Sequence, residues 1–135
     1  MKETQVAFEV DSALGFADAV KRARESLAKE GFGVLTEIDV QATMKAKLNV
    51  DGAPYRILGA CNPPLAHKAI TADPDIGLLL PCNVVVREQP DKKINVGFMD
   101  PIAVLKLTDN PAITEMAKAV RGKLERVRDQ LTRAG

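Results

Sequence analysis

Five segments of the chain carry the short-period pattern of apolar and polar residues that is typical of strands with one buried face. They are residues 4–10, 32–40, 55–61, 81–88 and 93–99. In the first segment, Val6, Phe8 and Val10 fall on the same side. The last two segments are separated by turn-forming residues at 89–91, which predicts a hairpin between them.

Apolar residues spaced three and four apart predict helices between these strands. Ser12 is a favourable N-cap for the first helix, and Gly31 is a favourable stop at its end. The apolar residues between these two are Phe16, Val20, Ala23 and Leu27. Residues 41–48 predict a second, short helix, with Met44 and Leu48 turned inward.

Two further helices begin at Asn-Pro signals. Asn62 is a favourable cap, and the two prolines after it fit a first helical turn, which predicts a helix from Pro63 to about Ala72. The last helix begins at Asn110. Its apolar stripe consists of Ile113, Met116, Val120, Leu124, Val127 and Leu131. The opposite face of this helix is basic, with six Lys or Arg against three Asp or Glu, and we interpret it as solvated surface.

The resulting order of elements is β-α-β-α-β-α-β-β-α. This order predicts an α+β fold in a single domain over residues 1–135, with a mainly antiparallel sheet and helices packed on one face. A doubly wound parallel sheet is the alternative. The hairpin and the lack of a Gly-rich phosphate loop disfavour it.

The composition is that of a soluble globular chain of 135 residues, with 46% hydrophobic and 27% charged residues. A formal charge of +1 gives no reason to expect nucleic acid or an anionic membrane as a partner. Residues 1–5 are not followed by the apolar run of a secretory signal. The longest apolar stretch, 76–82, is far shorter than the roughly 20 residues of a membrane span. We therefore expect a cytoplasmic protein with reduced cysteines.

The sequence lacks the familiar dinucleotide, P-loop, nucleophile-elbow and zinc-protease motifs, and it holds one histidine. Candidate chemistry is confined to two similar junctions. Cys61-Asn62 ends a strand just before a helix, and Cys82-Asn83 opens a later strand. The partial positive charge of a helix N-terminus favours a thiolate and attracts small anions. His67 lies about one and a half turns into the same helix.

Two interpretations of these residues stay open. In the first, Cys61, His67 and Cys82 converge on a metal such as zinc, on a haem or on a redox step, although their spacing matches no standard zinc finger. In the second, both cysteines are small buried hydrophobic residues and His67 caps a surface turn. We expect the nearby Arg56 to pair with an acidic residue of the segment 32–40 rather than with a ligand.

Two longer segments, Tyr55–Ala66 and Asp75–Val84, resemble the domain-of-unknown-function 302 family. The first contains the pattern G-x-C-N-P-x-x-A and the second contains L-L-P-C-N. Gly31-Phe32, residues 37–40 and the closing helix also fit, so the resemblance covers nearly the whole chain. It implies a compact α+β domain of bacteria and archaea that assembles as a homodimer. It implies no activity and supplies no catalytic residues.

The leading hypothesis is a cytoplasmic homodimeric module that binds a small ligand of unknown identity. Its pocket is expected where the strand ends near Cys61 and Cys82 meet the helix that begins at Pro63. The candidate ligand-binding residues are Cys61, Asn62, His67, Cys82 and Asn83. No residue is assigned to a metal, and no cofactor is assigned.

Two alternatives belong to other functional classes. One is a thiol- or metal-dependent redox or hydrolytic enzyme that uses Cys61, His67 and Cys82, which requires a lowered pKa at Cys61. The other is a regulatory subunit that binds a partner through the basic face of the last helix. The residues concerned there are Arg121, Arg126 and Arg128.

Overall fold

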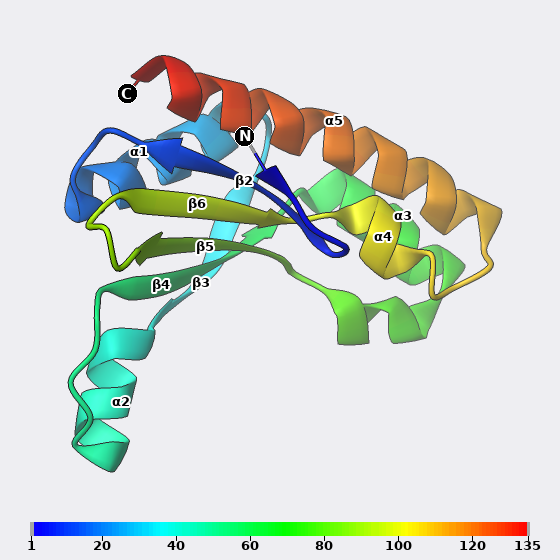
Figure 1. Ribbon diagram of the computed structural model, residues 1–135. Coiled ribbons are helices and arrows are strands. Elements are labelled where there is room, and N and C mark those ends of the chain that lie inside the picture. Colours follow the sequence, from blue (N-terminus) through cyan, green and yellow to red (C-terminus); the bar gives the residue numbers. More distant parts are fainter. Residues whose placement is uncertain (1, 135) are drawn as a thin grey trace.

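A computed structural model describes residues 2–134, and its six strands form one antiparallel sheet (Figure 1). The strands are β1 (Lys2–Glu3), β2 (Ala7–Ser12), β3 (Gly33–Asp39), β4 (Tyr55–Cys61), β5 (Cys82–Glu88) and β6 (Ile94–Met99). Their order across the sheet is β1-β2-β6-β5-β4-β3, and every neighbouring pair is antiparallel. The predicted α+β fold is therefore confirmed, and the doubly wound parallel alternative is wrong.

Helices cover one face of this sheet, as predicted, and one short helix lies on the other side. The helices are α1 (Phe16–Lys29), α2 (Val40–Leu48), α3 (Pro63–Ala72), α4 (Pro101–Leu105) and α5 (Pro111–Ala134), together with a 3-10 helix, η1 (Pro74–Leu79). The long α5 runs across the covered face and packs against α1, α3, α4 and β2 (Figure 1). Among the described residues, no helix has both the length and the apolar character to cross a membrane.

The core lies between α5 and the inner face of the sheet. All six residues of the predicted α5 stripe are buried. On the sheet side, the stacked rings of Phe8 in β2 and Phe98 in β6 lie 5.4 Å apart between centroids and are fully buried. Stacked aromatic rings add to the stabilisation that comes from burying their area. The centre of the sheet is thus held by an aromatic pair beneath a long aliphatic helix.

The first helix begins three residues later than the sequence predicts. Its N-cap is Gly15 rather than Ser12, which belongs to β2. The Ser12 hydroxyl is buried and accepts a hydrogen bond from the Leu14 amide at 3.1 Å. Ser12 thus shapes the turn before the helix instead of capping it. At the other end, Gly31 has a φ of 85°, the left-handed conformation expected of a glycine stop.

The second helix exists as predicted, but its expected orientation is wrong. Met44 and Leu48 were predicted to turn inward, whereas they are 41% and 65% exposed. The reason is the position of α2, which projects from the end of β3 on the side of the sheet away from α1 and α5 (Figure 1). The covered core is therefore out of its reach, and residues 41–48 are all exposed.

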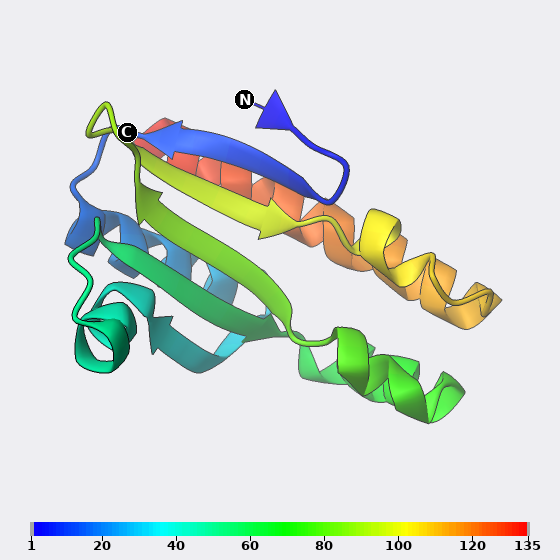
Figure 2. The ribbon, with the colours of Figure 1, turned by 60° about the horizontal axis from the view of Figure 1, so that its bottom comes forward.

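The face of the sheet opposite α5, which we call the open face, is shown in Figure 2 with α1 and α5 behind it. The outward side chains of its central strands include Ile57 of β4, Val85 of β5 and Met99 of β6, all half-buried. The open face carries a shallow groove of about 410 Å³, whose lining includes Tyr55 and Arg87. Two separate environments therefore flank the sheet: a closed core and a partly apolar open face.

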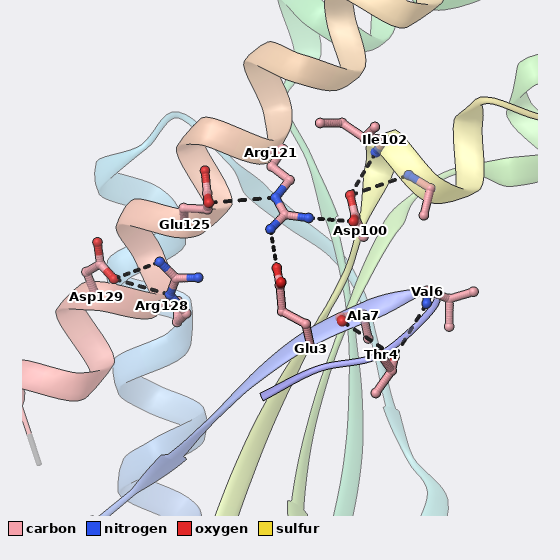
Figure 3. Close-up of polar contacts among 11 residues, drawn as sticks. Glu3, Thr4, Val6, Ala7, Asp100, Ile102, Arg121, Glu125, Arg128 and Asp129 are labelled. Atoms are coloured by element: carbon pink, nitrogen blue, oxygen red, sulfur yellow. Dashed lines mark hydrogen bonds and ion pairs between the residues drawn. The ribbon is translucent and has the colours of Figure 1, made fainter. Parts of the chain in front are cut away.

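The basic side of α5 is engaged within the chain. Arg121 donates hydrogen bonds to Asp100, the N-cap of α4, and to Glu3 in β1, and it forms an ion pair with Glu125 (Figure 3). Its guanidinium also lies 4.7 Å from the centroid of the Phe8 ring. Burial lowers the pKa of Arg121, but the hydrogen bond to Glu3 and the three nearby carboxylates outweigh burial and leave its pKa above the ordinary value.

The other two arginines of the predicted basic face have partners as well. Arg126 bonds Glu30 at 2.8 Å, and Arg128 bonds Asp129 at 3.1 Å (Figure 3 shows the second pair). These contacts hold α5 against α1 and against the ring of Phe8 rather than offering free positive charge. Reversing these charges would therefore perturb the fold as well as any partner.

Candidate functional site

A small crevice lies where the ends of β4 and β5 meet α3 and α5. Its volume is about 30 Å³, which is room for one or two water molecules. Three of the five candidate ligand-binding residues line it: Cys61, Asn62 and Cys82. The rest of the wall is almost entirely apolar. It consists of Phe32, Ala60, Leu65, Ala66, Leu80, Pro81, Met116 and Val120.

Strand pairing brings the two cysteines to the same end of the sheet. Ala60 and Cys82 are direct partners in the β4–β5 ladder, and Cys61 follows Ala60 in the chain. Both thiols are free; Cys82 is buried and Cys61 is partly exposed. The two cysteines, far apart in the sequence, therefore lie on neighbouring strands at one end of the sheet. Ala60 and Cys82 face the core, and the alternation of side chains along β4 directs Cys61 toward the opposite face.

Asn62 has a structural role at this junction. Its side-chain oxygen accepts a hydrogen bond from the Leu65 amide at 3.3 Å, which caps α3 as predicted. Its side-chain nitrogen lies 3.1 Å from the point where a Cβ on Gly31 would stand. A residue larger than glycine at 31 would press on Asn62 and would also have to adopt a positive φ. The cap and the glycine turn are thus fitted to each other.

His67 and Asn83 lie away from the crevice. His67 is exposed on α3, because the inward positions of that helix are taken by Leu65, Ala66 and Ala69. Asn83 is exposed on the open face and lines the groove there, since neighbouring residues of a strand point to opposite faces. The five candidates therefore divide between two faces of the molecule.

The geometry bears on the enzyme alternative. Among residues 2–134, no three His, Cys, Asp and Glu side chains gather as a metal site, so the interpretation that Cys61, His67 and Cys82 converge on zinc is wrong. Burial raises the pKa of the Cys61 thiol, and burial together with the neighbouring Cys61 raises the pKa of Cys82 to about 11. A thiol nucleophile needs the opposite shift. Burial therefore favours the protonated thiol at both positions.

Arg56 has the partners expected from the sequence. Its guanidinium lies 2.7 Å from Glu37 and 3.5 Å from Asp39, both on the neighbouring strand β3. Arg24 of α1 also contacts Glu37, so one carboxylate links a helix to two strands. The predicted cross-strand ion pair is confirmed, and Arg56 has no free charge directed at the crevice.

Two wall residues of the crevice were missed from the sequence. Met116 and Val120 belong to the buried stripe of α5, where the helical spacing indicates only core packing. No local pattern shows that this part of the stripe passes over the ends of β4 and β5. Met116 and Val120 therefore close the crevice from the helix side.

The fold has a counterpart in known proteins. Residues 8–131 match the family model of the domain of unknown function DUF302, and the chain belongs to this family. It is also similar to the crystal structure of an uncharacterised conserved DUF302 protein from Bacillus stearothermophilus, with 30% sequence identity and a TM-score of 0.85. The match covers 92% of this chain and 96% of that one. Comparison with curated proteins gives no match.

The two asparagines should respond differently to substitution. Asn62→Ala removes the cap of α3 and should lower the free energy of unfolding by about 1 kcal/mol. Asn83→Ala changes an exposed side chain and should alter the free energy of unfolding by no more than about 0.5 kcal/mol. Urea unfolding of both variants checks this. Equal losses would contradict the capping role of Asn62.

The thiols should react slowly and in order. With their pKa values raised, little thiolate exists at neutral pH, and alkylation should accelerate only as the pH rises. Cys61 should reach half its maximal rate at a higher pH than an unperturbed cysteine, and Cys82 should react fully only after unfolding. Rates of maleimide or iodoacetamide labelling against pH, measured on Cys61→Ala and Cys82→Ala, give each thiol separately. Rapid labelling of Cys61 at pH 7 would restore the enzyme alternative.

Proposed function

We propose that this protein is a cytoplasmic, homodimeric domain that binds a small ligand in the crevice lined by Cys61 and Cys82. The observation that carries the proposal is the crevice itself, which opens at the end of the sheet beside the N-terminus of α3. Sites of this kind are concave and mostly apolar, with a few polar groups at fixed positions. The proposal retains Cys61, Asn62 and Cys82 as ligand-binding residues and leaves out His67 and Asn83.

The size of the crevice limits its ligand. A volume of about 30 Å³ suits an ion or a molecule of very few atoms. The polar residues of its lining are Cys61, Asn62 and Cys82, and the positive end of α3 lies beside them. A cytoplasmic location is supported by the free thiols, which a reducing compartment preserves.

The homodimer is proposed through the open face. Its apolar residues include Ile57, Val85 and Met99. On the same side of the sheet, α2 contacts β4 and is a nine-residue helix exposed along nearly its whole length. Helices this short depend on tertiary packing for their stability. A second copy placed on the open face would cover the apolar strands and the exposed Met44 and Leu48 at once. One contact with a second copy would therefore bury both the apolar strand residues of the open face and the exposed apolar side chains of α2.

The ligand proposal is tested with three small probes: xenon, thiocyanate and dimethyl sulfide. Amide resonances of residues 60–66 and 80–82 should shift on addition of at least one probe. Ala66→Leu places extra carbon atoms in the crevice and should abolish these shifts. Ala72→Leu changes an exposed residue of the same helix and should retain them. No shift with any probe, or shifts confined to the open-face groove, would contradict the proposal.

The dimer is tested by light scattering during size-exclusion chromatography. The wild-type chain should elute with twice the mass of one 14.6 kDa chain. Val85→Asp places a charge in the proposed interface and should give a folded monomer, because an unpaired buried charge is strongly unfavourable. Leu107→Asp, at a residue 79% exposed and outside the open face, should remain dimeric. A monomeric wild type, or a dimeric Val85→Asp, would show that the open face is not the interface.

A further inference from the structure

The open face of the sheet carries a second concave site, the groove of about 410 Å³ (Figure 2 shows the strands that form it). This volume lies in the range of small-molecule sites, whereas the crevice beside Cys61 is far smaller. The lining of the groove combines apolar residues with a small number of polar ones. Three of the polar residues, Glu9, Arg87 and Asn95, come together at one place on the sheet.

The strand register places these three side chains around Gly97. Glu9 is the direct partner of Gly97 in the β2–β6 ladder, and Arg87 is the direct partner of Asn95 in the β5–β6 ladder. Asn95 lies two residues before Gly97 and therefore points to the same face of β6. A Cβ on Gly97 would lie 3.6 Å from Cγ of Glu9 and 3.9 Å from Oδ1 of Asn95. Because Gly97 has no side chain, it leaves a space between these two side chains.

The polar groups around this space are shielded from water but incompletely hydrogen-bonded. Asn95 is 6% exposed; its side-chain nitrogen donates to Asp11 at 3.1 Å, and within residues 2–134 no donor reaches its side-chain oxygen. The Glu9 side chain is 13% exposed, and its carboxylate lies 3.7 Å from the Arg87 guanidinium, which is too long for a hydrogen bond. Shielded polar groups without hydrogen bonds are costly, so this place favours a ligand that donates to both oxygens.

We propose that the open-face groove is a second binding site, whose ligand is a small α-amino acid with an apolar side chain. The ammonium group of the ligand donates to Glu9 and to Oδ1 of Asn95 above Gly97, and its carboxylate accepts from Arg87. An α-amino acid carries both charged groups on one carbon atom. It therefore matches a carboxylate and a guanidinium that lie 3.7 Å apart.

The rest of the groove suits the side chain of such a ligand. Val6, Val85, Met99 and Val104 line it, and none of them is polar. A simple amine would meet the positive charge of Arg87 without an anion of its own, and a simple carboxylate would meet the negative charge of Glu9. Unmatched charges of this kind discriminate against both.

This site goes beyond the proposed function, which places a smaller ligand in the crevice at the ends of β4 and β5. It is compatible with the homodimer proposed through the open face, because a second copy there would close a shallow groove over its ligand.

The test is calorimetric titration of the wild type with L-leucine and with two analogues that each lack one charged group. These analogues are 4-methylpentanoate, without the ammonium group, and 3-methylbutylamine, without the carboxylate. L-leucine should bind, and each analogue should bind at least about tenfold more weakly, because it loses one charge-assisted contact. Amide resonances of residues 83–87 and 95–99 should shift with L-leucine.

Variants assign the contacts. Glu9→Gln and Arg87→Gln should each weaken L-leucine about tenfold. Gly97→Ala keeps every charged group and should also weaken binding, because its methyl group occupies the space above β6. That methyl group makes only ordinary contact with Glu9, so the fold is kept. Glu25→Gln and Lys68→Gln remove the same charges from exposed positions on α1 and α3, and they are the matched controls that should bind as the wild type does.

The inference is overturned if L-leucine fails to bind, if both analogues bind as tightly as L-leucine, or if Gly97→Ala and the two charge variants leave its affinity unchanged. These outcomes are separable from those of the proposed function. If L-leucine fails while the dimer forms and a probe shifts the crevice amides, only the amino-acid site falls. If L-leucine binds in the groove while no probe shifts the crevice amides, the crevice proposal falls and this site stands.

Discussion

The packing of α5 on one face of the sheet is the constraint on which the rest of the structure depends. An antiparallel sheet of six strands must cover at least one face, and burial of apolar area is the main driving force for doing so. Residues 113–131 supply that cover in one continuous stripe, and each of its six apolar residues is buried. Because a single helix crosses the sheet, it touches β2 at one edge and the ends of β4 and β5 further along. Residues of α5 therefore form part of the core and also line the crevice.

The polar side of α5 reinforces this packing. Arg121 ties the first strand and the start of α4 to the helix, and its guanidinium lies over the ring of Phe8. A partly buried arginine with three carboxylate partners is costly to disrupt, since removing one partner leaves charge unpaired in a shielded place. The sequence shows the polar face of α5 only as an excess of positive charge. In the folded chain, its arginines make fixed contacts to α1, α4 and β1. Its composition was visible from the sequence, but its partners were not.

Local patterns carry most of the fold. The five strand segments, the hairpin at 89–91 and the helix beginning at Pro63 follow from alternation, turn residues and capping, all of which act over a few residues. The orientation of α2 does not follow from such patterns. Met44 and Leu48 are four residues apart, and this spacing is the same whether the two side chains pack against the core or lie exposed. The start of α1 was misplaced for a related reason: the hydroxyl of Ser12 supports a turn as readily as a helix cap.

The candidate site was only partly predictable because it depends on long-range pairing. Helix periodicity was enough to show that His67 lies on a different side of α3 from Leu65 and Ala69, and alternation along β5 separates Asn83 from Cys82. The placement of Cys61 and Cys82 at one end of neighbouring strands needs the β4–β5 register, and the presence of Met116 needs the path of α5. Neither is recorded in local sequence.

Burial of the two thiols determines which chemistry suits them. A nucleophilic cysteine needs a stabilised thiolate, and here desolvation acts in the opposite direction at both positions. The raised pKa values therefore argue against catalysis by Cys61, but they do not argue against an uncharged ligand in the crevice that Cys61 and Cys82 line.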